Sequence, residues 1–142
     1  KDNYPELTIL QNETNQGFSA TCNKGAKVAK ESILLFLNTD MLPRHLDTTY
    51  ILNQFKDPTL FALSPKIERK DQSGKLINEA ITTGFFKSGW FSSEVTPDYE
   101  SHQKSTSFPI LWACGGACFV DREKFNTLSG FDTAYSPFYF EV

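Results

Sequence analysis

The stretch ILLFLNTDMLP, residues 33–43, contains five consecutive apolar residues that end abruptly in a polar triplet. Such a run is typical of a strand buried on both faces in a parallel α/β sheet, and ligands bind at the carboxyl ends of these strands. Asn38 and Asp40 are two residues apart, so their side chains point to the same side of an extended backbone. Asp40 could bind a divalent cation there through oxygen. The alternative is a simple turn that leads to Pro43 at the start of the next helix.

The composition fits one compact domain and argues against several functions. The chain has 142 residues and a formal net charge of −3, which speaks against nucleic-acid binding. Its three cysteines, Cys22, Cys114 and Cys118, are too few for a disulfide framework and lack nearby histidines for a zinc site. They indicate a reduced compartment. No stretch reaches membrane-spanning length and no signal peptide is visible.

Hydrophobic periodicity predicts strands that alternate with helices. Helices are expected over residues 19–30, from Pro43 onward with an apolar face of Leu46, Tyr50, Leu52 and Phe55, and over residues 122–128 before Gly130. Strands are expected at residues 7–10, 33–37, 61–67, 109–112 and 117–120, with a turn at 71–74 and a long irregular segment at 82–107. This order predicts an α/β fold with a mainly parallel sheet and flanking helices.

Six segments, in this order along the chain, resemble the family 2 glycosyltransferases of the GT-A fold, most closely bacterial rhamnosyltransferase-like members. They are NQGF (15–18), NKG (23–25), LFLNTD (35–40) with Pro43, WACGGACFVDR (112–122), GFD (130–132) and FYFEV (138–142). The resemblance covers nearly the whole chain. It implies an inverting enzyme that transfers a sugar from a nucleotide-diphosphate sugar to a glycan or lipid-linked acceptor of the bacterial cell envelope.

The resemblance also implies roles for individual residues. Asn38 and Asp40 occupy the motif that binds Mg²⁺ or Mn²⁺ and the donor diphosphate, with Asp40 as the metal ligand. Asn15, Gly17 and Asn23 would lie near the donor nucleotide. On the acceptor side, the resemblance points to Gly115, Gly116 and Trp112.

Alignment from the GFD segment without gaps places Glu141 on the catalytic acid and Phe140 on the acidic position before it. Transfer requires a departing diphosphate to be stabilised and an acceptor hydroxyl to be deprotonated. Asp40, through the metal, and Glu141, as general base, would meet these two needs.

Each of these residues also has a purely structural interpretation. Asn15 and Gly17 could form a turn, Asn23 could be a polar residue on a helix surface, and the Gly115–Gly116 pair could permit tight strand packing. Glu141 could be an exposed surface residue. The three aromatic residues Trp90, Phe91 and Trp112 could belong to the core or could stack on sugars, and the core is the better interpretation for Trp112.

The chain begins at Lys1, after the position of the family's first strand and nucleotide-recognising acidic motif, and it closes on an unfinished element. We therefore expect residues 1–142 to be a partial catalytic domain, cut at both ends and lacking the first βαβ portion, that is inactive by itself. A missing βαβ unit would expose a sheet edge and favour self-association. The expected location is the cytoplasm, with peripheral attachment to the inner face of the membrane as a possibility.

Two other functions remain open at this point: a non-catalytic carbohydrate-binding or scaffold domain of the same fold, and a nucleotidyltransferase. A binding module has no need of a base at Glu141. A nucleotidyltransferase would need a basic, glycine-rich phosphate loop near its N-terminus, and none is visible in this sequence.

Overall fold

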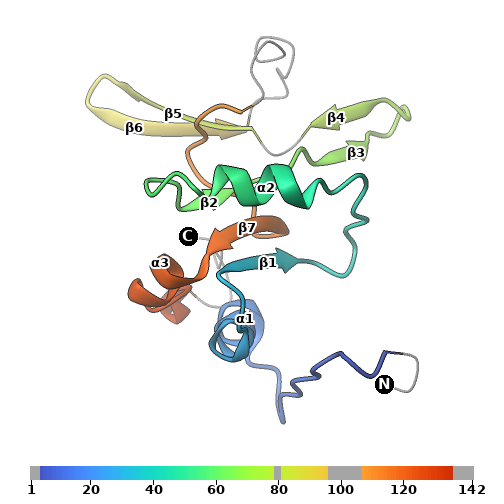
Figure 1. Cartoon of the computed structure of the whole chain (residues 1–142). Coiled ribbons are helices and arrows are strands. Elements are labelled where there is room, and N and C mark those ends of the chain that lie inside the picture. The colour runs from blue at the N-terminus through green and yellow to red at the C-terminus, as the bar shows by residue number, and fades with distance from the viewer. Residues whose placement is uncertain (1–3, 79–80, 96–106, 136–142) are drawn as a thin grey trace. The chain divides into compact units, whose positions relative to one another are not determined.

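The computed structural model describes residues 4–78, 81–95 and 107–135 of the chain (Figure 1). Two compact units can be distinguished, and each is described by itself. One comprises residues 33–121, and the other combines residues 1–32 with residues 122–142. Glu141 lies outside the described residues.

The unit 33–121 is built on a sheet of three strands in the order β1-β7-β2. The strands are β1 (Ile33–Leu37), β7 (Ala117–Asp121) and β2 (Ala62–Leu63). The central strand β7 is buried from Ala117 to Val120, whereas β1 buries only Leu34 and Phe36. The prediction of β1 is confirmed, but its burial on both faces is not, because Leu35 and Leu37 are 41% and 42% exposed.

The prediction of a mainly parallel sheet is wrong for the strands that the structure describes. Both β1 and β2 pair antiparallel with β7, which lies between them. It follows that β1 and β2 run in the same direction, as two strands joined by a helix should. The alternation of strands and helices fixes that shared direction, but it does not reveal that a strand from much later in the chain separates the two.

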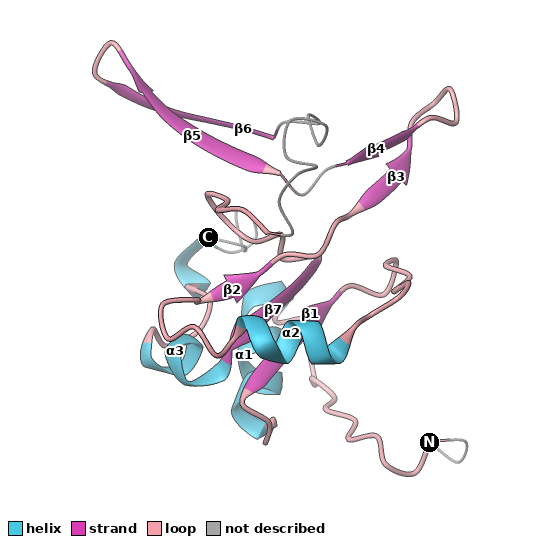
Figure 2. Ribbon diagram, turned by 45° about the horizontal axis from the view of Figure 1, so that its top comes forward, coloured by secondary structure: helices cyan, strands magenta, loops and turns pink. Residues whose placement is uncertain are grey.

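Helix α2 (Thr48–Gln54) connects β1 to β2 and covers one face of the sheet (Figure 2). The prediction that this helix begins at Pro43 is wrong. Asp47 supplies its N-terminal cap, because the Asp47 Oδ1 accepts a hydrogen bond of 2.9 Å from the Tyr50 backbone N–H. Ile51 is the buried residue of this helix.

Two antiparallel hairpins also belong to the described part of this unit. The first joins β3 (Glu68–Lys70) to β4 (Leu76–Asn78), and its turn confirms the one predicted at residues 71–74. There the Ser73 hydroxyl donates to Asp71, and this hydrogen bond, with a second from the Lys75 backbone N–H, lowers the pKa of the Asp71 carboxyl. The second hairpin joins β5 (Thr82–Lys87) to β6 (Trp90–Val95).

The hairpin β5–β6 replaces part of the irregular segment that we predicted at 82–107. Its turn residues, Ser88 and Gly89, have φ values of 52° and 83°. Positive φ at both central positions is the geometry that fits the twist of a two-residue hairpin. The polar and aromatic composition of this segment concealed a pattern of good strand formers around a Ser-Gly turn.

Three other predicted strands are shorter than expected or do not form. Residues 7–10 and 109–112 have no strand structure, and the strand expected at 61–67 is limited to Ala62–Leu63. Pro65 lacks the backbone N–H that a strand ladder requires, which accounts for the early end of β2.

The second unit contains α1 (Gly17–Val28), α3 (Arg122–Thr127) and the 3₁₀-helix η2 (Thr133–Tyr135). Three aromatic rings pack against one another in it, and Phe125 is the buried one: the Phe131 centroid lies 5.6 Å from that of Phe18 and 5.1 Å from that of Phe125. Both predicted helices are confirmed, each with slightly different ends. The cysteines are free, and burial raises the pKa of the Cys22 thiol.

Gly130 caps the C-terminal end of α3, as predicted. It has a φ of 80°, and its N–H donates a 2.9 Å hydrogen bond to the Phe125 carbonyl. A Cβ at this position would overlap the side-chain amide of Asn23. Gly130 is therefore required for its backbone conformation and for the close approach of α1.

We expect Gly130→Ala to destabilise the chain more than Gly74→Ala. Both glycines have positive φ, 80° and 85°, but a Cβ at Gly74 meets nothing within 4 Å. Strain alone should cost about 1–2 kcal/mol at either site, and displacement of Asn23 should add about 1–3 kcal/mol at Gly130. Urea unfolding followed by circular dichroism measures both losses, and equal losses would contradict the role given to Asn23.

Candidate functional site

The polar triplet after β1 is held by a continuation of the β1–β7 ladder. The Asn38 N–H donates a 2.8 Å hydrogen bond to the Gly116 carbonyl, one position beyond the Leu37–Ala117 pair. The Met41 N–H then donates to the Asn38 carbonyl at 3.1 Å, which closes a turn through Thr39 and Asp40. Asp40 is exposed on this turn.

Gly116 lies close to this turn. A Cβ on Gly116 would come within 2.9 Å of Met41 Cε and 3.4 Å of Asn38 Nδ2. The end of β1 and the start of β7 therefore meet at one edge of the sheet, although they are far apart in the sequence. The structure thus brings the segment that contains Asn38 and Asp40 next to the segment that contains Gly115 and Gly116, through the contact of Asn38 with Gly116.

The donor set at this edge is sparse but suits Mg²⁺ or Mn²⁺ on a diphosphate. Among the residues that the structure describes, no group of three or more His, Cys, Asp or Glu side chains could hold a metal. Mg²⁺ is commonly bound by one or two carboxylates together with substrate phosphates. One exposed carboxylate, Asp40, on the turn two residues after Asn38 is consistent with such a shared site.

Asn15 and Gly17 belong to the other compact unit, where they form the turn before α1. The Gly17 N–H donates a 2.9 Å hydrogen bond to Asn15 Oδ1, and Gly17 has a φ of 77°. These two residues therefore form the turn that was their purely structural interpretation. Contact of either residue with the donor stays a prediction.

Asn23 lies on α1 and binds the backbone of Phe131 with both ends of its side-chain amide. Its Nδ2 donates to the Phe131 carbonyl at 2.8 Å, and its Oδ1 accepts from the Phe131 N–H at 2.9 Å. Asn23 is therefore a clamp between α1 and the segment after α3, and its predicted contact with the donor is untested.

The core interpretation preferred for Trp112 is wrong, because 39% of its surface is accessible. Its backbone is bound by the buried hydroxyl of Thr82, which donates to the Trp112 carbonyl at 3.0 Å and accepts from its N–H at 3.1 Å. The base of the hairpin β5–β6 is thereby fixed to the segment that leads to Gly115 and Gly116.

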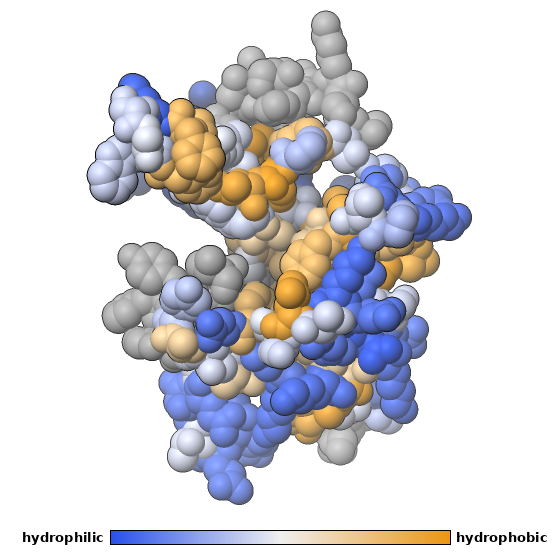
Figure 3. Space-filling view, turned by 90° about the vertical axis from the view of Figure 1, so that its left-hand side faces the viewer, coloured by the Kyte–Doolittle hydropathy of each residue, from blue (hydrophilic) through white to orange (hydrophobic). Residues whose placement is uncertain are grey.

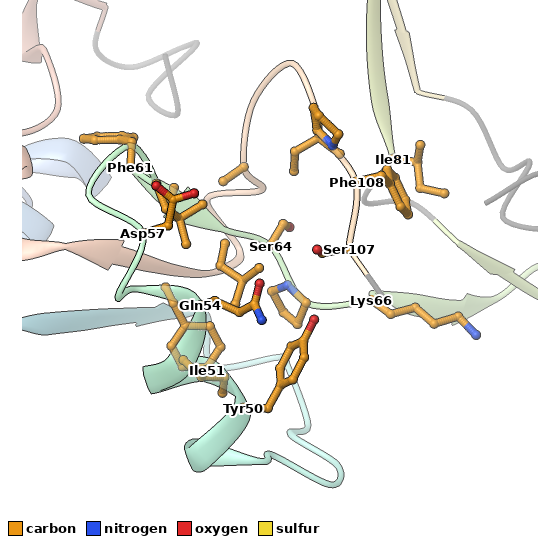
Figure 4. Close-up of a pocket in the computed structure, with 18 of the residues that line it drawn as sticks. Tyr50, Ile51, Gln54, Asp57, Phe61, Ser64, Lys66, Ile81, Ser107 and Phe108 are labelled. Atoms are coloured by element: carbon orange, nitrogen blue, oxygen red, sulfur yellow. The ribbon is translucent and has the colours of Figure 1, made fainter. Parts of the chain in front are cut away.

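A cavity of about 880 Å³ in the unit 33–121 was not foreseen from the sequence (Figure 4). It lies beside α2 and β2, and Asn38, Asp40 and Gly116 are not among its lining residues. The polar groups of Tyr50, Gln54 and Ser64 point into it, with Ile51 and Phe108 among the apolar walls. The spacing of Tyr50 and Gln54, four residues apart on one helix face, was the available signal.

Comparison with protein-family models assigns the chain to a family. The family model described as glycosyl transferase family 2 matches residues 1–128. The chain belongs to glycosyl transferase family 2. A comparison with curated proteins gave no match.

Membership of this family implies the GT-A nucleotide-sugar transferase fold and a glycosyltransferase type of function, with a nucleotide-sugar donor and a glycan acceptor. Enzymes of the family commonly use divalent metal ions. In the described residues, no helix has the length and apolar character needed to cross a membrane.

We expect Thr82→Val to destabilise the chain by about 1–3 kcal/mol, because the Trp112 N–H and carbonyl would both lose a buried partner. Thr82→Ser is the matched control, since it keeps the hydroxyl and removes only a methyl group. Its loss should be smaller, about 1 kcal/mol. Urea unfolding compares the two variants, and a larger loss for Thr82→Ser would show that packing, not hydrogen bonding, holds Trp112.

Proposed function

We propose that this chain carries the catalytic site of a metal-assisted, inverting glycosyltransferase of the rhamnosyltransferase-like type. In this proposal the donor is a nucleotide-diphosphate sugar, and the acceptor is a glycan or lipid-linked glycan of a bacterial cell envelope, made on the cytoplasmic side. The family match supports the transferase class. The net charge of −3 agrees with a substrate other than nucleic acid.

The observation that carries this proposal is the meeting of Asn38 and Gly116 through the 2.8 Å hydrogen bond at the end of β1. That bond joins the segment with the proposed metal ligand to the segment proposed for the acceptor. Donor and acceptor must approach within reacting distance, so a transferase needs the two segments at one edge. The family match favours a glycosyltransferase over a nucleotidyltransferase, and a scaffold domain of the same fold would be recognised by the absence of sugar transfer.

In the proposed reaction, an acceptor hydroxyl oxygen forms a bond to the anomeric carbon while the bond from that carbon to the diphosphate breaks. The diphosphate leaves with the bonding electron pair, and the hydroxyl proton passes to the carboxylate of Glu141, the proposed general base. Attack on the face opposite the leaving group inverts the anomeric centre. A metal bound through Asp40 would neutralise charge on the diphosphate. Asn38 would assist by hydrogen bonding, and Trp112 would bind the acceptor.

We expect Asp40→Asn to weaken Mg²⁺-dependent binding of a nucleoside diphosphate by about tenfold or more, because the proposed ligand loses its charge. Calorimetry with and without Mg²⁺ measures this effect. The control is Glu123→Gln, which removes an exposed carboxylate on α3 and should leave the affinity unchanged. If Asp40→Asn binds as tightly as the unchanged chain in Mg²⁺, the proposed metal site is wrong.

For Glu141→Gln we expect a different pattern. Because we propose that residues 1–142 are part of a longer enzyme and inactive alone, the variant is made in that longer protein. There, transfer of a labelled sugar should fall by roughly a hundredfold to ten-thousandfold, the usual contribution of a general base. Mg²⁺-dependent binding of the diphosphate should persist, since the amide keeps the shape of the carboxyl group. Undiminished transfer would remove Glu141 from the mechanism. A parallel loss of diphosphate binding would assign Glu141 to donor binding instead.

A further inference from the structure

The far end of the hairpin β5–β6 exposes four aromatic side chains. Phe86 and Trp90 are 80% and 79% exposed, and Phe91 and Phe85 are 52% and 43% exposed. We call these four residues the aromatic tip. Figure 3 shows the side of the molecule toward which the hairpin points in Figure 1. Hydrophobic residues, coloured orange, are exposed on this side. Exposed apolar groups of this size gathered at one place mark an interaction surface.

The aromatic tip presents rings on both faces of the hairpin. The register pairs Phe86 with Phe91, and their rings meet edge to face with centroids 5.2 Å apart. Lys87 pairs with Trp90 in the next position. Because successive residues of a strand alternate between faces, Phe85, Lys87 and Trp90 lie on the face opposite Phe86 and Phe91. A partner with a flat surface could cover only one of these faces.

The base of the hairpin is firmly attached, in contrast to the tip. The Leu111 N–H donates to the Thr82 carbonyl at 2.9 Å. Gly84 lies under Phe91 and Leu111, since a Cβ on Gly84 would come within 2.8 Å and 2.9 Å of those side chains. The exposure of the aromatic tip is therefore a property of a fixed hairpin with a two-residue turn at its end, Ser88 and Gly89.

We infer that the aromatic tip inserts into the headgroup layer of an anionic membrane. Tryptophan and other aromatic side chains favour this layer, where apolar and polar surroundings meet. A lipid layer surrounds an inserted hairpin, so it accommodates rings on both faces. A sugar would instead stack on one ring face, and a second copy of the chain would cover one side.

The charges of the hairpin agree with this partner. Lys87 lies beside the turn, where its ammonium group would meet lipid phosphates. The hairpin has one acidic residue, Glu94, which pairs with Thr83 near the base. Charge therefore changes from positive at the tip to negative at the base, in the direction that favours insertion of the tip.

The test uses vesicles of phosphatidylcholine with and without phosphatidylglycerol, and the 142-residue chain with Trp112→Phe, so that Trp90 is the remaining tryptophan. Vesicles with phosphatidylglycerol should shift Trp90 emission to shorter wavelength and sediment the chain. Phe86→Ser with Trp90→Ser, made in the unchanged chain, should weaken sedimentation by about tenfold or more. Leu128→Ser, which removes a side chain 66% exposed on the other unit, should not weaken it.

Three results would overturn the inference. The first is equal sedimentation of the double variant and the unchanged chain. The second is self-association in the ultracentrifuge that the double variant abolishes while vesicles have no effect, which would assign the tip to contact between copies. The third is a shift of Trp90 emission on addition of a soluble oligosaccharide with no response to vesicles, which would assign it to sugar binding. Circular dichroism of each variant verifies that the chain is folded.

Discussion

The antiparallel pairing of β1 with β7 is the constraint on which the unit 33–121 depends. Closing the chain between Leu37 and Ala117 orders a long loop, whose entropic cost grows only slowly with its length. The pairing places buried side chains of both strands in one core and continues to the Asn38–Gly116 hydrogen bond. Without it, the two segments that make up the candidate site would have no fixed relation.

Local sequence patterns predicted several of the helices, strands and turns. The strand at residues 33–37, the helices α1 and α3 and the turn at 71–74 all follow from apolar spacing and turn chemistry. The neighbours of β1 could not be foretold, because pairing depends on contacts between distant segments. The start of α2 depended on one side chain, since Asp47 offers a cap that Pro43 cannot. The hairpin β5–β6 was concealed because two-sided exposure of aromatic residues removes the usual alternation.

The candidate site was foreseen in its parts more than in its arrangement. The sequence indicated Asn38, Asp40 and Gly116 as separate candidates, and the structure joins Asn38 to Gly116 at the end of β1. The asparagines illustrate why residue type alone does not settle a role. The side-chain oxygens of Asn15 and Asn23 each accept a hydrogen bond from a backbone N–H. Asn38, in contrast, is held by hydrogen bonds of its own backbone. The cavity beside α2 had no signal in the sequence other than the spacing of Tyr50 and Gln54, because a cavity arises from the packing of several elements against one another.

The clamp formed by Asn23 has a consequence for dynamics. The Phe131 amide lies outside any helix or strand, yet its N–H and carbonyl both have side-chain partners on α1. Exchange of this amide hydrogen with solvent is therefore governed by the separation of α1 from the Gly130–Phe131 backbone, and not by the fraying of a local helix. The slowest-exchanging positions in this unit need not coincide with its regular secondary structure, and Phe131 would report directly on how often α1 moves away.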